Sequence, residues 1–319
     1  MLLIRLFGSL TIQHERANGA GEGLILSGHV AGILAFLALA RGRYFSRDEL
    51  IGAIWEEQRE EAVSAGAFNT TLWRLRKQIE LPPCRAGARL ARDRRGFICL
   101  REDADIQLDI EEFEQQTAVG LKKPLEQLSS EDIDGLKAGV TLYRADILGN
   151  FSSEWALRER EKQRRTYLNV LGRLLSICKL RAEYDAGIRY AQMILDCDPL
   201  REDIHRELMQ LYEQNGQRAL ALKQFEACRR LLRKELAIPP MRETSALYQH
   251  IAEHALHPEQ TTDSGSFNLT LPLKEPDVPL SPHSHIRQQQ RWRASINQAR
   301  QHLAVADAQL QYSLRLFEE

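Results

Sequence analysis

Apolar residues alternate loosely with polar ones along the first dozen residues, on either side of Gly8 and Ser9. This alternation predicts a short antiparallel pair of strands, and residues 23–27 are expected to add a third. Apolar residues then recur with helical spacing over residues 28–40, which predicts a buried helix. The residues of that stripe are Val30, Ile33, Leu34, Leu37 and Leu39.

A second helix is predicted to start at Ser46, because Ser46 and Glu49 form a Ser-x-x-Glu capping box. A third helix is predicted over about residues 62–80, where Pro82-Pro83 would end it. Its apolar stripe, which should face the core, consists of Phe68, Leu72, Leu75 and Ile79.

After the third helix, the stretch ARLARDRRGFICL has apolar residues on both sides of Asp93-Arg94-Arg95-Gly96. This pattern suits a hairpin with glycine in its turn. Strands, three helices and a basic hairpin would complete a small α+β domain, for which we predict the boundaries 1–101.

From about residue 109 to residue 256 the pattern is helical almost throughout, which predicts an all-α second domain over residues 102–256 and a chain that is mainly α. A shift of thirty-four residues superposes apolar and small positions, and this period, with its alternation of large and small residues, resembles tetratricopeptide helix pairs. The superposed pairs are Leu174 with Leu208, Leu175 with Met209, Cys178 with Tyr212, Gly187 with Ala221, Ala191 with Phe225, and Ile194 with Cys228.

The last sixty residues divide into two segments. Residues 257–285 contain five prolines among Ser, Thr and Asp and predict a flexible linker. Residues 286–319 predict an amphipathic helix, because Trp292, Ile296 and Leu303 begin a seam of apolar residues spaced by fours and threes. Such a helix could dimerise, dock on the repeats of its own chain, or stand as a loose helix.

Charge is segregated along the chain, although the net charge is only −1. Residues 66–101 hold nine basic and two acidic residues, a net charge of +7, whereas residues 102–160 hold six basic and fourteen acidic residues, a net charge of −8. This asymmetry indicates a polyanionic partner for the N-terminal domain.

Composition indicates a soluble globular protein, with 43% hydrophobic and 27% charged residues and a mean hydropathy of −0.39. The longest apolar run, residues 30–40, is too short to span a membrane, and the N-terminus lacks the features of a signal peptide. Five widely spaced cysteines without a CxxC pair indicate reduced thiols. We therefore expect a cytoplasmic protein.

The third predicted helix has a polar side that could contact a nucleic acid. Helical geometry places six residues on its outer arc: Asn69, Thr70, Trp73, Arg74, Arg76 and Lys77. Such residues can hydrogen-bond to the edges of nucleobases or bind phosphates in the DNA major groove. Basic side chains on a helix are, however, more often simply solvated. A capped helix before it and a hairpin after it favour one continuous anion-binding surface. The hairpin would contribute Arg92, Arg94 and Arg95, and Trp73 could either pack against that hairpin or contact DNA.

Five motifs occur in a characteristic order: RLFGSLTI, YFSRDELIGAIW, NTTLWRLRKQI, RRGF and LDIEEFEQ. In this order they resemble the antibiotic regulatory protein (SARP) family over about residues 1–255. The resemblance implies an OmpR-like winged-helix domain followed by a bacterial transcriptional activation domain of tetratricopeptide-like helices.

The resemblance further implies a transcription factor that binds promoter DNA repeats and contacts RNA polymerase. By this resemblance the helix with Asn69, Trp73, Arg74 and Arg76 enters the major groove of double-stranded DNA. Arg94 and Arg95 would then lie on the wing near the minor groove. The sequence has no GxxxxGK[ST] motif, so we expect no cofactor and no ATP control within this chain.

Three rival interpretations remain open. The chain could be a non-catalytic adaptor whose basic surface meets an acidic protein, or a transcriptional repressor. A weaker rival is a metal hydrolase around His250 and His254, which are four residues apart, but no Cys or carboxylate pair completes a metal site. The GxSxG motif is absent and the acidic residues near Glu111 suit a helix start, so we expect no enzyme.

Overall fold

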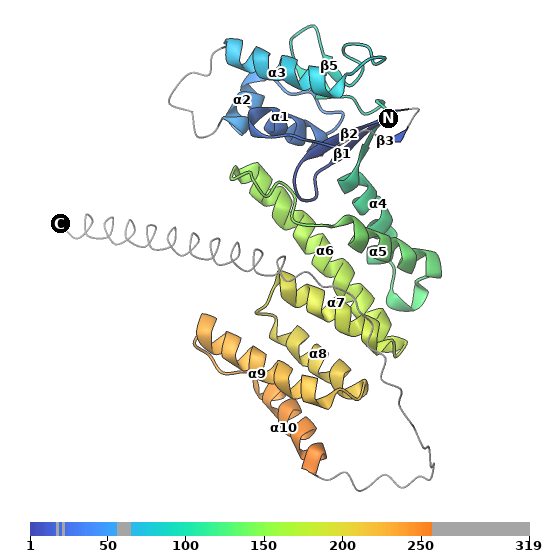
Figure 1. Ribbon diagram of the computed structural model, residues 1–319, viewed down its shortest axis with the longest axis vertical. Coiled ribbons are helices and arrows are strands. Elements are labelled where there is room, and N and C mark those ends of the chain that lie inside the picture. Colours follow the sequence, from blue (N-terminus) through green and yellow to red (C-terminus); the bar gives the residue numbers. More distant parts are fainter. Residues whose placement is uncertain (17–18, 21–22, 56–64, 257–319) are drawn as a thin grey trace, which may run out of the picture. The chain divides into compact units, whose positions relative to one another are not determined.

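The computed structural model describes residues 1–16, 19–20, 23–55 and 65–256 (Figure 1). These residues fall within one compact unit, Met1–Gln260. The predicted linker, 257–285, and the predicted amphipathic helix, 286–319, lie outside the described residues. Among the described residues, no helix is both long and apolar enough to cross a membrane.

A small sheet opens the chain. Strand β1 (Leu2–Arg5) pairs antiparallel with β2 (Thr11–Arg16), with Gly8 at a φ of 90° in the connection. The short strands β3 (Gly19–Ala20) and β4 (Leu24–Ile25) both pair with β2. The predicted antiparallel pair and third strand are therefore confirmed. The sequence pattern did not predict β7 (Ile106–Leu108), which returns after the hairpin to pair in parallel with β1.

Three helices follow the first strands. They are α1 (Gly28–Leu39), α2 (Arg47–Ile54) and α3 (Ala65–Ile79). The capping box of α2 is present as predicted, because the Ser46 side chain accepts from the Glu49 N–H while the Glu49 carboxylate accepts from the Ser46 N–H. The first residues of the predicted third helix, 62–64, lie outside the described residues, and α3 ends at Ile79, shortly before Pro82.

The predicted hairpin is also present. Strand β5 (Leu90–Arg92) pairs antiparallel with β6 (Ile98–Leu100), and Gly96 has a φ of 91° in the turn between them. Only glycine adopts such a conformation without strain. Phe45, which precedes α2, forms a bridge with Ile98, so the hairpin is joined to the helical part of the domain.

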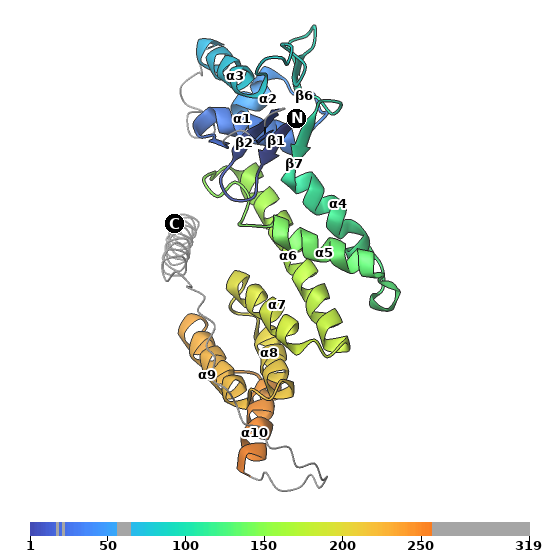
Figure 2. The ribbon, with the colours of Figure 1, turned by 45° about the vertical axis from the view of Figure 1, so that its right-hand side comes forward.

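The rest of the described chain is helical, as predicted. The helices are α4 (Asp109–Lys122), α5 (Ser130–Leu142), α6 (Glu154–Leu180), α7 (Tyr184–Cys197), α8 (Glu202–Gln214), α9 (Arg218–Glu235) and α10 (Arg242–Leu256), with a single 3₁₀ turn, η2 (Leu125–Gln127), before α5. Every residue of the six superposed pairs is buried. The thirty-four-residue period thus marks equivalent core positions in the helix pairs α6–α7 and α8–α9 (Figure 2).

The N-terminal sheet and the first of the following helices share one hydrophobic core. The Asp109 carboxylate, at the start of α4, accepts hydrogen bonds from the backbone N–H groups of Leu6 and Phe7 at 2.8–3.0 Å. The Phe7 ring contacts Phe113 and Tyr143, with ring centroids 5.3 and 4.8 Å apart. These buried hydrogen bonds and ring contacts fix the start of α4 and the end of α5 against the residues that follow β1.

A second contact joins α6 to the helix that precedes α3. Trp155 Nε1 donates to the carbonyl oxygen of Ala53 at 2.9 Å, and the Trp155 ring meets Phe36 edge to face at 5.2 Å. Ala53 lies in the last turn of α2, where carbonyl groups have no partner within the helix. The start of α6 therefore completes the hydrogen bonding of α2.

Candidate nucleic-acid interface

Helix α3 has one buried and one exposed side. Phe68, Leu75 and Ile79 are at most 2% exposed, and Leu72 is 6% exposed, so the predicted apolar stripe faces the core. Five of the six predicted outer residues are exposed: Asn69, Thr70, Trp73, Arg74 and Lys77. Amino and guanidinium groups on this side are therefore available to a ligand in solvent.

The sixth outer residue, Arg76, is half-buried and contacts the hairpin. Its Nη2 donates to the carbonyl oxygen of Leu90 at 3.1 Å. Since Leu90 begins β5, Arg76 joins α3 directly to the first strand of the hairpin. Arg76 therefore makes a structural contact with the hairpin, which its predicted position on the outer arc of the helix did not indicate.

Glu80 and Arg89 add a second joint between α3 and the hairpin. The Glu80 carboxylate, just after α3, accepts from the backbone N–H groups of Gly87, Arg89 and Leu90 at 2.9–3.1 Å. In the opposite direction, the Arg89 guanidinium donates to the carbonyl oxygen of Ile79 and pairs with Asp105 at 3.0 Å. These bonds fix the orientation of the hairpin relative to α3.

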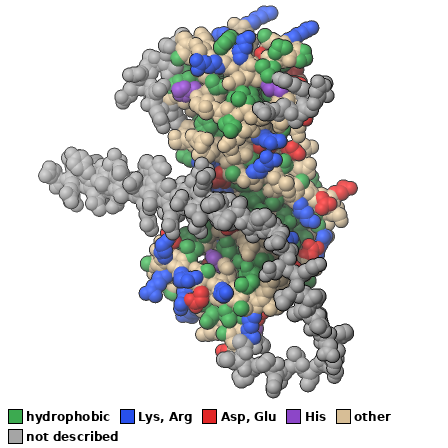
Figure 3. Space-filling view, in the orientation of Figure 1, with side chains coloured by type: hydrophobic (Ala, Val, Ile, Leu, Met, Phe, Trp, Pro, Cys, Tyr) green, Lys and Arg blue, Asp and Glu red, His purple; other side chains and the backbone are tan. Residues whose placement is uncertain are grey.

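The tip of the hairpin exposes three arginines. Arg92, Arg94 and Arg95 are all exposed, and Asp93 shapes the turn by accepting from the N–H groups of Arg95 and Phe97 at 2.9 and 2.8 Å. Within the part of the chain that the structure describes, none of the three arginines forms an ion pair. Figures 1 and 2 both place α3 beside β5 and β6, and Figure 3 shows Lys and Arg side chains projecting over these elements.

Trp73 stands on the exposed side of α3 instead of packing against the hairpin. Its side chain is 59% exposed, and the Lys77 ammonium lies 5.8 Å from the centre of its ring. An indole ring in this setting can stack on or pack against a ligand. This exposure is compatible with a contact between Trp73 and DNA, which stays a prediction.

Two of the basic residues counted between 66 and 101 form ion pairs within the protein, one buried and one at the surface. Arg89 is only 4% exposed and pairs with Asp105, while Arg101 pairs with Asp103 at 2.5 Å. The exposed charge of this segment is therefore smaller than the sequence count of +7. What remains is concentrated on α3 and on the hairpin.

Three exposed residues next to these elements were not singled out from the sequence. Arg43 and Tyr44 are exposed just before the bridge from Phe45 to Ile98, and Arg85 is exposed in the loop between α3 and β5. Arg43 is held over the Phe45 ring at 4.6 Å and lies 3.8 Å from Glu49. Their place beside the hairpin is a tertiary relationship. The sequence signal for Arg43 and Tyr44 is only their closeness to the capping box, and for Arg85 only its position before the hairpin.

The described residues offer no metal site around the histidines that were considered for one. Among the described residues, no group of three or more His, Cys, Asp or Glu side chains could hold a metal ion. His250 lies on the exposed side of α10, and the side chains of His254 and His257 lie outside the described ones. The metal interpretation thus has no support from geometry.

Comparison with known proteins adds evidence on the family. Residues 108–252 match the family model described as the bacterial transcriptional activator domain. The chain is 25% identical over 226 residues to the transcriptional regulatory protein MoaR1 of Mycobacterium tuberculosis, covering 69% of this chain and 70% of MoaR1. The chain thus contains a bacterial transcriptional activator domain and is similar to SARP-type transcriptional regulators.

Two further relatives differ from this chain in length. The regulatory protein AfsR of Streptomyces coelicolor is 25% identical over 221 residues, which are 69% of this chain but only 22% of AfsR. A solved structure of EmbR from Mycobacterium tuberculosis, in complex with a low-affinity phosphopeptide, matches with a TM-score of 0.60 and 19% identity. That match covers 79% of this chain and 65% of the EmbR chain, and it confirms the predicted fold class.

Proposed function

We propose that this chain is a SARP-type regulator, a sequence-specific transcriptional activator that binds promoter repeats through residues 1–101 and recruits RNA polymerase through residues 102–256. The observation that carries this proposal is the joint between two exposed basic elements. Arg76, Glu80 and Arg89 hold the hairpin beside α3, and this supports a common surface to which exposed Arg74, Lys77 and the hairpin arginines would contribute.

The shape of this surface suits a DNA duplex. An α-helix fits the major groove, where Asn69 and Arg74 carry groups that can read base edges. Lys77 and Arg92 would bind backbone phosphates, and Arg94 and Arg95 at the hairpin tip would reach the neighbouring minor groove. Thr70 and Trp73 would complete the contact between the grooves.

The helical domain would act at the same promoter as a fixed extension of the DNA-binding domain. Support comes from the contacts of Asp109 and Trp155 with the N-terminal domain, which leave little freedom between the two. A protein bound to DNA in this way can present its helix pairs to RNA polymerase at a defined distance. In this proposal the regulator is cytoplasmic, takes no cofactor and catalyses no reaction, and its C-terminal segment could support self-association.

Mapping where the regulator sits on its own genome tests the proposal most broadly. We expect crosslinked DNA to be enriched at discrete promoters that contain repeats of one short sequence. A non-catalytic adaptor, whose basic surface meets only an acidic protein, would give no such enrichment.

The direction of regulation needs a separate experiment. Transcription from a mapped promoter, with purified RNA polymerase and the full chain, should increase when the regulator is added. A decrease would instead support the repressor alternative, because a protein bound near a promoter can block polymerase.

A further inference from the structure

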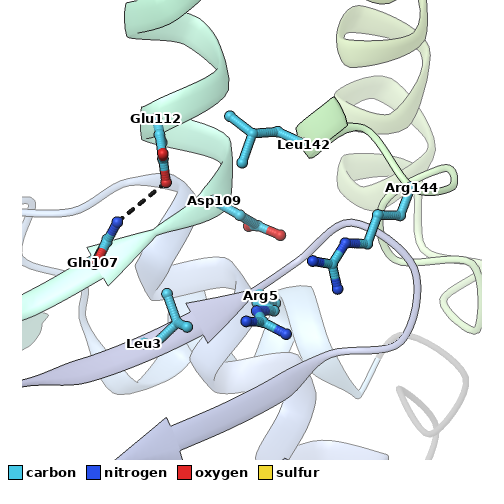
Figure 4. Close-up of a pocket in the computed structure, with 7 residues that line it drawn as sticks. All are labelled: Leu3, Arg5, Gln107, Asp109, Glu112, Leu142 and Arg144. Carbon is cyan, nitrogen blue, oxygen red and sulfur yellow. Dashed lines mark hydrogen bonds between the residues drawn. The ribbon is translucent and has the colours of Figure 1, made fainter. Parts of the chain in front are cut away.

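A pocket of about 190 Å³ lies where the N-terminal sheet meets the helical domain (Figure 4). Strand β1 contributes Leu3 and Arg5, β7 contributes Gln107, and α4 contributes Asp109 and Glu112. The end of α5 and the loop after it close the pocket with Leu142 and Arg144. Its walls therefore come from both domains.

Two guanidinium groups face the inside of this pocket. Figure 4 shows the Arg144 side chain extending from the loop after α5 toward Arg5 and the Asp109 carboxylate. Within the described residues, neither the Arg5 nor the Arg144 side chain donates a hydrogen bond or forms an ion pair. The two positively charged guanidinium groups thus lie at one small pocket, where their N–H groups outnumber the acceptors that they bond to.

The two carboxylates of the pocket are already engaged elsewhere. Asp109 accepts from the N–H groups of Leu6 and Phe7, and Glu112 accepts from Gln107 Nε2 at 3.1 Å. Burial raises the pKa of Asp109, while those backbone hydrogen bonds and the nearby charge of Arg5 oppose the rise. The Asp109 charge acts on Arg5, but among the described residues neither carboxylate accepts a hydrogen bond from a guanidinium of the pocket, so these donors are open to another partner.

We propose that the pocket binds a small oxyanion between Arg5 and Arg144. The planar, fixed donors of a guanidinium match the oxygens of a phosphate or a carboxylate and can bind them with two hydrogen bonds at once. A dry cavity of about 150 Å³ holds a ligand the size of benzene, so 190 Å³ suits roughly five to eight non-hydrogen atoms. Inorganic phosphate and short dicarboxylates have this size, whereas a nucleotide exceeds it.

A ligand in this position would join the two domains. Arg5 belongs to the sheet of the DNA-binding domain, while Arg144 belongs to the loop that leads from α5 to α6. Binding to both would stabilise the folded arrangement of the domains, because a ligand that binds only the folded state raises its stability. The regulator would then respond to a small metabolite without a dedicated ligand domain.

Thermal unfolding of the full chain in a buffer free of phosphate and carboxylate tests the proposal. Inorganic phosphate and succinate are titrated separately, and sodium chloride at matched ionic strength controls for screening. We expect a saturable rise in the unfolding midpoint with at least one of the two oxyanions and none with chloride. A preference for phosphate identifies a phosphoryl ligand, and a preference for succinate identifies a carboxylate.

Variants locate the effect within the chain. Arg144→Gln and Arg5→Gln should each weaken the oxyanion about tenfold or more. Arg144 lies on an exposed loop, so its replacement should leave the midpoint without ligand unchanged even if Arg5→Gln lowers it. Arg94→Gln is the matched control, since it removes an exposed arginine of the hairpin and should bind the oxyanion like the original protein.

The proposal would be overturned if the oxyanions raised the unfolding midpoint of Arg144→Gln as much as that of the original chain. It would also be overturned if chloride raised the midpoint as much as the oxyanions do. Arg5 and Arg144 would then have only a structural role. This result is independent of DNA binding. Arg94→Gln should lose DNA affinity while keeping the oxyanion site, and Arg144→Gln should lose the oxyanion site without the loss of affinity expected from a phosphate contact.

Discussion

Arg76 Nη2 donates a hydrogen bond to the carbonyl oxygen of Leu90 at 3.1 Å, and this bond joins α3 to the hairpin. Arg76→Ala should lower the free energy of unfolding by about 1 kcal/mol, because a buried carbonyl loses a charged donor. The same change should weaken DNA binding, since the hairpin loses one of its attachments to α3. Urea unfolding and a fluorescence titration with promoter DNA measure the two effects.

Arg74→Ala is the matched variant on the same helix. Arg74 is exposed, so its replacement should change the free energy of unfolding by less than about 0.5 kcal/mol and weaken only DNA binding. If Arg76→Ala proves as stable as the original chain, the bond to Leu90 does not contribute to the joint.

Trp155→Phe should loosen the contact between the helical domain and α2. The indole N–H that bonds to Ala53 at 2.9 Å is lost, while a ring remains to contact Phe36. We expect a loss of about 1 kcal/mol in the free energy of unfolding. Leu157→Ala, a change at a 48% exposed position on the same helix, is the control and should stay within about 0.5 kcal/mol. Equal urea midpoints for both variants would contradict the role assigned to Trp155.

Gly135→Ala should destabilise the contact between α4 and α5. A Cβ atom on Gly135 would lie 2.7 Å from the backbone oxygen of Gln116, which cannot move without displacing α4. We expect a cost of about 1–3 kcal/mol. Gly172→Ala in α6 meets nothing within 4 Å and should stabilise the protein by up to about 1 kcal/mol through helix propensity. Thermal unfolding of both variants measures these changes. An unchanged unfolding midpoint for Gly135→Ala would contradict the close packing of α4 against α5 at this position.

Asp132 should make the start of α5 sensitive to acid. Hydrogen bonds from Lys123, at 2.7 Å, and from the N–H and hydroxyl of Ser129 lower its pKa to about 2. Because the folded state holds the charged form, the stabilisation is present above the ordinary pKa near 4 and is lost as pH falls toward 2. Asp132→Asn should therefore lower the unfolding midpoint by a few degrees at pH 7.

The difference between Asp132→Asn and the original chain should shrink as the pH is lowered from 5 to 2. Asp134→Asn is the control, because Asp134 is 74% exposed and 3.7 Å from Lys137. A midpoint difference for Asp132→Asn that is constant across this pH range would show that its charge does not matter.

Local signals were sufficient for much of the fold. The capping box at Ser46, the glycine turn at Gly96 and the buried pairs such as Leu174 with Leu208 all follow from short-range rules of backbone geometry and periodicity. These features depend on residues close in sequence or on a repeated unit. A single sequence is enough to place them.

Long-range partners could not be read from the same pattern. Arg89 adds to the basic charge of its segment in the sequence. In the folded chain it is buried, pairs with Asp105 and donates to the carbonyl oxygen of Ile79, and no local pattern indicates these partners. The parallel pairing of β7 with β1 and the bond from Trp155 to Ala53 join residues about a hundred positions apart. No periodicity encodes such contacts, and the pocket formed by Arg5 and Arg144 was missed for the same reason.

The central claim is that α3 and the hairpin bind one duplex together. Its most direct test is the affinity of the full chain for a mapped promoter fragment, measured between about 50 and 200 mM salt. If roughly five phosphates are contacted, log affinity should fall with log salt with a slope near −4 to −5. Lys77→Ala combined with Arg92→Ala should make the slope shallower by about 2, and Lys77→Ala alone by about 1. A slope near zero, or one unchanged in both variants, would contradict the claim.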